Sequence, residues 1–143
     1  MSLASQRSPV VEEGTFYEVA GGQFSTAATW FVQAAWTTVG SDNYVSWLWS
    51  DHNSTMLLTS DVPQLTDELD GDTTYMLAAL PRTYGTTATL HIDRPGLKPV
   101  AVPLQDPGPE FDRTLAAYAF TEPGMFTAWI EAPDGSILAE WPS

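Results

Sequence analysis

Turn signals divide this chain into short runs that suit β-strands. Clusters of Gly, Pro, Asp and Asn recur roughly every 8–15 residues, and the runs between them are rich in aromatic and β-branched residues. Many of these runs alternate apolar with polar positions, as a strand with one buried face requires. The clearest case spans residues 122–141, where Pro133-Asp134-Gly135 separates two apolar runs. Asp-Gly between such runs is the strongest short-range signal of a β-hairpin, so the chain is predicted to close with one.

Two aromatic runs form the densest apolar feature of the chain. Residues 29–39 and 44–49 are separated by a turn at residues 40–43, so the two runs are expected to pair as antiparallel strands. Period-2 alternation then predicts one shared apolar face in each strand, made of Trp30, Val32, Ala34 and Trp36 in the first and of Val45, Trp47 and Trp49 in the second.

The remaining runs complete an all-β pattern. Strands are expected at residues 14–20 (stopped by Gly21-Gly22), 55–59, 73–80, 86–92, 99–104 and 111–120, and residues 60–72 are expected to form a connecting loop. Pro99 and Pro103 have no main-chain N–H to donate to a neighbouring strand, so residues 99–104 are expected at the edge of a sheet. For 111–120, whose alanines also suit a helix, strand is preferred because Pro123-Gly124 soon closes the run. About nine short strands indicate an antiparallel β-sandwich of Ig-like type, with a barrel as the alternative.

The predicted domain organisation is simple. Residues 1–13 are polar and small and are expected to form an extended N-terminal arm, while residues 14–143 form a single β-sandwich domain. No signal peptide is visible at the N-terminus, and no apolar run is long enough to span a membrane.

Composition excludes several classes of function. The chain has no Cys, which removes disulfides, thiolate metal sites and thiol nucleophiles together. The chain has five Lys and Arg residues and 18 Asp and Glu residues, which gives a net charge of −13. Because the basic residues are scattered, neither nucleic acid nor an anionic membrane is an expected partner. The negative charge favours cationic partners instead.

The few residues with catalytic or metal-binding chemistry are poorly arranged for it. Ser50, Asp51 and His52 are the residue types of a hydrolase triad, but sequence neighbours do not provide its geometry, so a polar turn is preferred. His52 and His91 lie on different elements, and His91 falls on the outward position of an alternating strand. No catalytic residue, and therefore no enzyme activity, is predicted.

An acidic stretch offers the only candidates for a metal. Asp67, Asp70 and Asp72 concentrate carboxylates beside Gly71, as calcium loops do, but they do not match the EF-hand spacing. A solvated acidic loop is the preferred interpretation, with these residues as weak calcium candidates. No cofactor is predicted.

The Trp residues are the main candidates for a functional surface. A sandwich of this size hides several Trp in its core, while the others can form a ligand platform or a subunit interface. The candidates are Trp30, Trp36, Trp47, Trp49, Trp129 and Trp141.

The C-terminal unit carries a resemblance. Its Pro-Gly-Met-Phe-Thr-Ala-Trp-Ile-Glu-Ala-Pro-Asp-Gly-Ser-Ile-Leu sequence resembles the last two strands of Ig-like modules in bacterial surface proteins and bacteriophage virion proteins. The resemblance covers the C-terminal hairpin only. It departs from antibody-type domains, since there is no Cys pair and Phe126 stands where a Tyr is expected, and it carries over no functional residue.

Together with the all-β pattern, the resemblance implies a non-enzymatic virion protein, such as a capsid decoration or head or tail surface subunit of a bacteriophage. Such a protein is made in the host cytoplasm and incorporated into the virion. Its expected partners are copies of itself, in a homo-oligomer such as a trimer, and other virion subunits. One alternative is a carbohydrate- or small-ligand-binding module that uses exposed Trp, and another is a β-barrel enzyme with an aromatic pocket.

Overall fold

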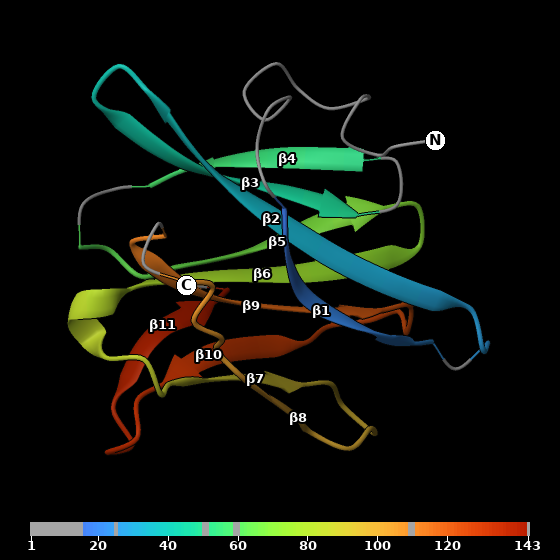
Figure 1. Cartoon of the computed structure of the whole chain (residues 1–143). Helices are drawn as coiled ribbons and strands as arrows, with labels where there is room; N and C mark the ends of the chain where they lie inside the picture. Colours follow the sequence, from blue (N-terminus) through green and yellow to red (C-terminus); the bar gives the residue numbers. More distant parts are fainter. Residues whose placement is uncertain (1–15, 25, 50–51, 59–60, 109–110, 143) are drawn as a thin grey trace. The chain divides into compact units, whose positions relative to one another are not determined.

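The computed structural model describes residues 16–24, 26–49, 52–58, 61–108 and 111–142 (Figure 1). The predicted all-β, antiparallel fold is confirmed, although the chain forms eleven strands rather than about nine. Among the described residues, the only helical element is a single 3-10 turn, η3 (Arg82–Tyr84). The chain divides into two compact units, one up to Ser60 and one from Asp61 onward. The predicted arm at residues 1–13 lies outside the described residues.

The first unit is one four-stranded antiparallel sheet in the order β1-β2-β3-β4. Its strands are β1 (Tyr17–Gln23), β2 (Thr29–Val39), β3 (Asp42–Trp49) and β4 (His52–Leu57). The predicted pairing of the two aromatic runs is confirmed, because Ala34 lies opposite Trp47 and Trp36 opposite Val45. The turn between them needs only Gly40 and Ser41, and Gly40 has the positive φ of 63° that a two-residue hairpin turn requires.

Strand β1 extends further than its sequence indicates. Gly21 and Gly22 were expected to end the strand but lie within it, opposite Phe31 and Trp30. A Cβ atom at Gly22 would lie only 3.1 Å from Nε1 of Trp30, so the glycine leaves room for the indole over the neighbouring strand. The glycine pair therefore serves the packing of Trp30 rather than a turn.

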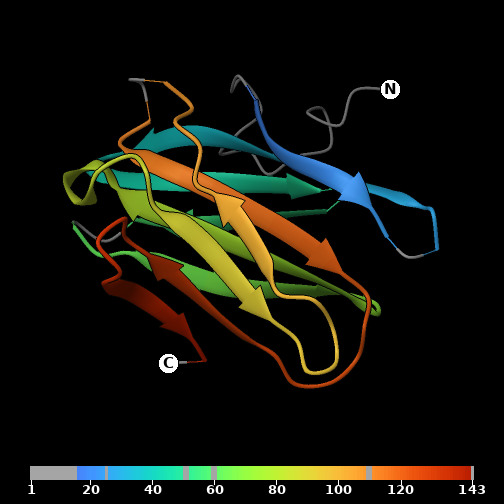
Figure 2. The same ribbon diagram turned by 90° about the horizontal axis from the view of Figure 1, so that it is seen from below.

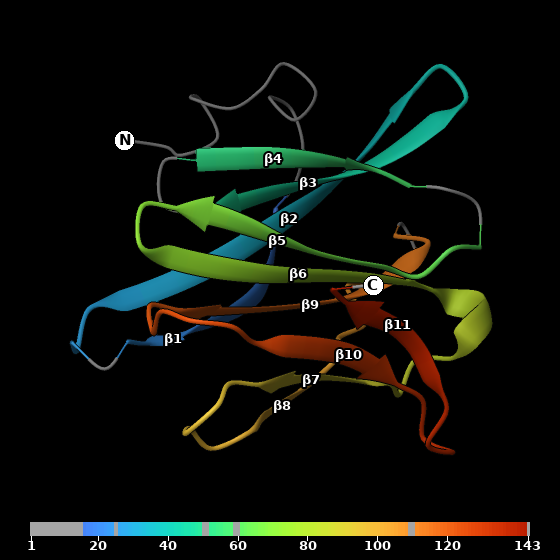
Figure 3. The same cartoon turned by 180° about the vertical axis from the view of Figure 1, so that it is seen from behind.

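The second unit contains two antiparallel sheets (Figure 3). One has the order β5-β6-β9 and the other the order β11-β10-β7-β8. The strands are β5 (Gln64–Asp70), β6 (Thr73–Pro81), β7 (Thr89–Asp93), β8 (Val100–Pro103), β9 (Arg113–Phe120), β10 (Thr127–Glu131) and β11 (Ile137–Trp141).

The two sheets of this unit share one hydrophobic core. Met76, Leu80 and Ala116 of the first sheet cluster with Leu90 and Ile130 of the second. All five side chains are fully buried. No strand of one sheet pairs with a strand of the other, so this unit is a β-sandwich and not the barrel that the sequence left open. The strand order resembles that of Ig-like sandwiches, in which the chain crosses between the sheets.

Strand β5 corrects the prediction of a loop at residues 60–72. Residues 64–70 pair with β6 along the whole strand, and Gly71 (φ 65°) and Asp72 form the tight turn between them. The spacing of Leu65 and Leu69 fits a strand as well as a helical turn, because residues four apart share a face in both. Leu65 packs against the core cluster, and this packing supports the strand despite its acidic composition.

The structure of residues 100–120 also matches what the sequence predicts. β8 is the edge strand that its prolines predict, since it pairs with β7 alone. Figure 2 shows β7 and β8 side by side. Directly after β8, Gln105 leaves that sheet and exchanges two main-chain hydrogen bonds with Leu115 of β9, at 2.8 and 2.9 Å. The segment at 111–120 forms a strand and not a helix.

The predicted closing hairpin is confirmed as β10 and β11. Gly135 N–H donates to the Ala132 carbonyl, and Gly135 has a φ of 92°. This geometry is a type I turn followed by a left-handed glycine, the common form of the longer hairpin loops. No helix in the described part of the chain is long and apolar enough to cross a bilayer.

Candidate functional site

The outward face of the β11-β10-β7-β8 sheet carries the candidate site. Leu90 and Ile92 of β7 and Ala128 and Ile130 of β10 point into the core, so the alternate residues point away from it. We name this surface the His91–Trp129 face. Its residues are Thr89, His91, Asp93, Ala101, Pro103, Thr127, Trp129, Glu131, Ile137 and Glu140.

Strand register places an aromatic pair at the centre of this face. His91 of β7 lies directly opposite Trp129 of β10, and Glu140 of β11 lies opposite Trp129 on the other side. The imidazole and indole rings stack with their centroids 5.2 Å apart and an interplanar angle of 13°. The prediction that His91 points outward is confirmed, since its side chain is 28% exposed while its neighbours in the strand on the inner face are fully buried.

Glu131 holds the two rings in place. Trp129 Nε1 donates a hydrogen bond to Glu131 Oε1 at 3.3 Å, and the same oxygen lies 3.5 Å from His91 Nε2. Glu131 lies two residues after Trp129 in β10, so strand alternation puts both side chains on one face. One carboxylate oxygen therefore contacts the indole nitrogen of Trp129 and the Nε2 nitrogen of His91. The result is a stacked, partly exposed aromatic pair on a sheet surface.

The charge of the face is negative. Asp93, Glu131 and Glu140 lie among the outward positions of these strands, and none of those positions is Lys or Arg. Lys98 lies outside the face, in the turn between β7 and β8. Of the remaining outward residues, Thr127, Ala101 and Pro103 are exposed and Thr89 is partly buried, while Ile137, which lies opposite Glu131, is an apolar side chain that is 48% exposed.

The six Trp candidates differ in burial. Trp30, Trp47 and Trp49 are buried, and all three come from the first unit. Trp36, Trp129 and Trp141 are partly exposed. Trp141 stacks on Phe126 with centroids 4.7 Å apart, and both pack against the core of the second unit. Trp129 is therefore the candidate that an outward sheet face presents together with polar groups.

The carboxylates that the sequence offered for a metal are not brought together. Asp67 and Asp70 lie three apart in β5, so they point to opposite faces of the strand, and Asp72 lies beyond it in the turn. Of the Ser50-Asp51-His52 stretch, only His52 is among the described residues, where it begins β4. Within the described ranges, no three His, Asp or Glu side chains are placed to hold a metal ion.

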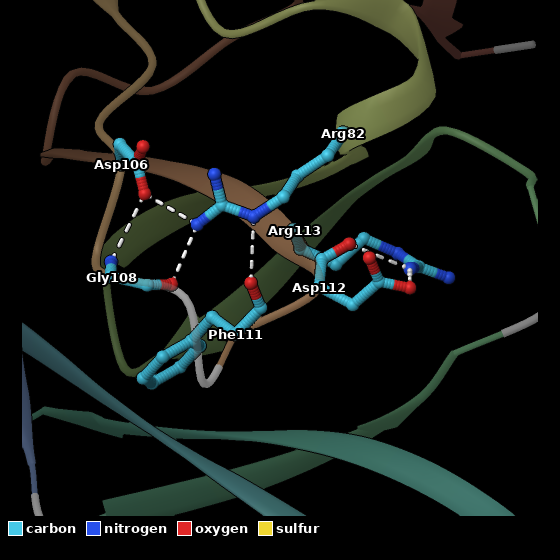
Figure 4. Close-up of polar contacts among 6 residues, drawn as sticks. All are labelled: Arg82, Asp106, Gly108, Phe111, Asp112 and Arg113. Atoms are coloured by element: carbon cyan, nitrogen blue, oxygen red, sulfur yellow. Dashed lines mark hydrogen bonds and ion pairs between the residues drawn. The ribbon is translucent and has the colours of Figure 1, made fainter.

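The arginines of the second unit have structural contacts (Figure 4). Arg82 Nε donates to the Phe111 carbonyl at 2.8 Å, and Nη2 donates to the Gly108 carbonyl at 2.6 Å and to Asp106 Oδ1. This fork spans the segment that links β8 to β9. The hydrogen bond from Arg82, with a second one from Gly108 N–H, lowers the pKa of Asp106 to about 2. Arg82 therefore braces a connection rather than a binding surface.

Arg94 also makes structural contacts. Its Nη1 donates to Glu122 Oε1 at 2.5 Å, and its guanidinium lies 5.0 Å from the centroid of the Phe120 ring. Arg113 is buried, and its Nη1 contacts Asp112 through the main-chain carbonyl at 2.9 Å and the carboxylate at 3.4 Å. These three arginines neutralise acidic neighbours and do not form a basic patch.

Sequence reasoning identified Trp129 and the outward position of His91 but not their pairing. The signal that could have found Glu131 is its position two residues after Trp129 in an alternating strand. The pairing with His91 depends on β10 lying beside β7, and no local sequence pattern predicts that these two strands are neighbours. No family model, curated protein or solved structure matches the chain.

Proposed function

We propose that this protein is a non-enzymatic assembly subunit of a bacteriophage virion, such as a capsid decoration or head or tail surface protein. The single observation that carries the proposal is the His91–Trp129 face. A sheet face is flat, and its centre is an aromatic pair that Glu131 holds in one arrangement. Trp is enriched in protein interfaces, and a restrained ring loses little conformational entropy when a partner covers it.

The all-β architecture supports the same proposal. Antiparallel sheets with short turns and a shared core give a rigid module, which suits a structural subunit. The acidic composition, with a net charge of −13, suits a surface that stays solvated after assembly. In this proposal, the protein joins copies of itself or other virion subunits, and it is located in the particle.

Proteomics of purified particles tests the proposal. We expect the chain in nuclease-treated, gradient-purified virions of the phage that encodes it, in a copy number that matches one class of symmetry-related positions. A chain that is abundant in infected cells but absent from purified particles would overturn the proposal. Light scattering behind size exclusion, with and without calcium, then determines whether the free chain forms a trimer or another closed oligomer.

A second candidate is a carbohydrate-binding module. It is favoured by the same indole, because an aromatic ring beside a carboxylate and an imidazole offers both stacking and hydrogen bonds to a sugar. Quenching of Trp fluorescence across a panel of glycans tests it, with Trp129→Leu as the control that must remove the response. Flat titrations across the panel would contradict this candidate.

A further inference from the structure

The two sides of the Trp129 ring differ. β10 lies between β7 and β11, and His91 stacks on the indole from the β7 side. The separation of 5.2 Å matches the spacing of cross-strand neighbours, about 4.5–5.5 Å, so the two nearly parallel rings stand side by side across the sheet. The opposite face of the indole is therefore turned toward β11.

One carboxylate neighbours that second side of the ring, and another lies at the edge of the ring. Glu140 is the register neighbour of Trp129 on β11 and is exposed. Glu131 contacts the Nε1 edge of the same ring. An indole face is electron-rich and attracts cations, and a guanidinium that lies flat on it can also donate to neighbouring carboxylates. The arrangement combines both kinds of attraction at one point.

We propose that Trp129, Glu131 and Glu140 form a docking site for an arginine or lysine side chain of a partner protein, with arginine preferred. The proposal rests on the proposed function, because it names the chemistry of the partner that covers the His91–Trp129 face. Charge complementarity supports it, since the face bears carboxylates without Lys or Arg and the chain as a whole has a net charge of −13.

A second copy of this chain carries the same net charge of −13, so it is a poor source of that cation. Among the described residues, Arg82, Arg94 and Arg113 already contact carboxylates, which leaves Lys98 in the β7–β8 turn, while Arg7 lies outside those residues. Guanidinium groups stack on aromatic rings and bind carboxylates through a planar fork, properties that an ammonium group lacks. The occupant is therefore a different subunit with a basic surface.

Nuclear magnetic resonance of the indole N–H groups in the full chain tests the site. The Trp129 signal is identified as the one missing in Trp129→Leu. The probes are N-acetyl-arginine amide, N-acetyl-lysine amide, the neutral isostere N-acetyl-citrulline amide and methyl glucoside. We expect a saturable shift of the Trp129 signal with arginine, a weaker response with lysine and none with citrulline or the sugar.

A matched pair of variants tests whether the Glu140 carboxylate contributes to binding of the arginine probe. Glu140→Gln removes an exposed carboxylate beside the ring, and we expect it to raise the dissociation constant for the arginine probe about threefold. Asp67→Asn removes one carboxylate from the other sheet of the same unit, and we expect it to leave the constant unchanged. Circular dichroism spectra that match the parent protein show that both variants fold.

Four results would overturn the inference: no shift with arginine, equal shifts with arginine and citrulline, a shift with the sugar alone, or equal effects of Glu140→Gln and Asp67→Asn. These results do not bear on whether the chain is in the virion. A chain found in particles but unresponsive to arginine refutes the docking site alone, whereas a responsive chain absent from particles refutes the proposed function alone.

Discussion

Replacing Arg82 tests how the second unit holds the connection between its two sheets. Arg82→Met keeps the aliphatic stem and removes every donor. Two partly buried main-chain carbonyls, of Gly108 and Phe111, then lose the hydrogen bonds that they accept from Arg82, although the Gly108 carbonyl keeps the one from Phe111 N–H. A hydrogen bond contributes about 0.5–1.5 kcal/mol net, so the loss is expected to lower the free energy of unfolding by about 2 kcal/mol. The ion pair with Asp106 is exposed, so this figure does not include it.

Arg82→Lys refines the same prediction. An ammonium group is a compact donor without a planar fork, so it cannot reproduce the separate bonds from Nε and Nη2. We expect it to recover about half of the lost free energy, or about 1 kcal/mol. Lys98→Met is the control, because it removes an exposed cation from a turn of the same unit.

Urea unfolding followed by circular dichroism gives the free energies, and hydrogen exchange locates the effect. We expect faster exchange at the Gln105 and Leu115 amides, which bond to each other where the chain leaves β8. The reasoning is refuted if Arg82→Met stays within about 0.5 kcal/mol of the parent protein, as surface substitutions do. It is also refuted if Arg82→Lys is indistinguishable from the parent.

Three further predictions concern other parts of the fold. The pKa of Asp106 is lowered from 3.8 to about 2 in the folded chain, so the stability from its pairing with Arg82 is present above pH 3.8 and is lost as the pH falls toward 2. The difference in urea midpoint between the parent and Asp106→Asn should therefore shrink over that range, and a constant difference would contradict the assignment. Gly22→Val should cost about 1–3 kcal/mol by forcing Trp30 to move, seen as a changed near-ultraviolet circular dichroism spectrum, and an unchanged spectrum and stability would count against that packing. Leu90→Ala should cost about 2–5 kcal/mol in urea unfolding, because Leu90 is fully buried, and a loss below about 1 kcal/mol would mean that the core does not depend on it.

Most of the strands and most of the turns follow from local patterns in the sequence. The alternation of Trp30, Val32, Ala34 and Trp36 is a local property, and so is the Pro-Asp-Gly turn before β11. Both follow from the period of two in an extended chain and from the few residues that accept turn geometry. These features needed no knowledge of the rest of the molecule.

Predictions from local sequence patterns were wrong where contacts with a distant segment decide the structure. The acidic stretch at 64–70 becomes a strand because β6 pairs with it and Leu65 reaches the core. Gly22 remains within β1 because Trp30 of the next strand occupies the space beside it. In both cases, pairing and packing outweigh the preferences of the segment itself.

The candidate site was decided by the tertiary structure. Trp129 and Glu131 share a face by alternation, which the sequence states, but His91 and Glu140 become their neighbours only through the strand order β11-β10-β7-β8. His91 lies far from Trp129 along the chain, and its place depends on the sheet that forms around the common core. Residue types and spacing determine a strand and its two faces, whereas the burial of those faces against other segments determines which strands lie side by side.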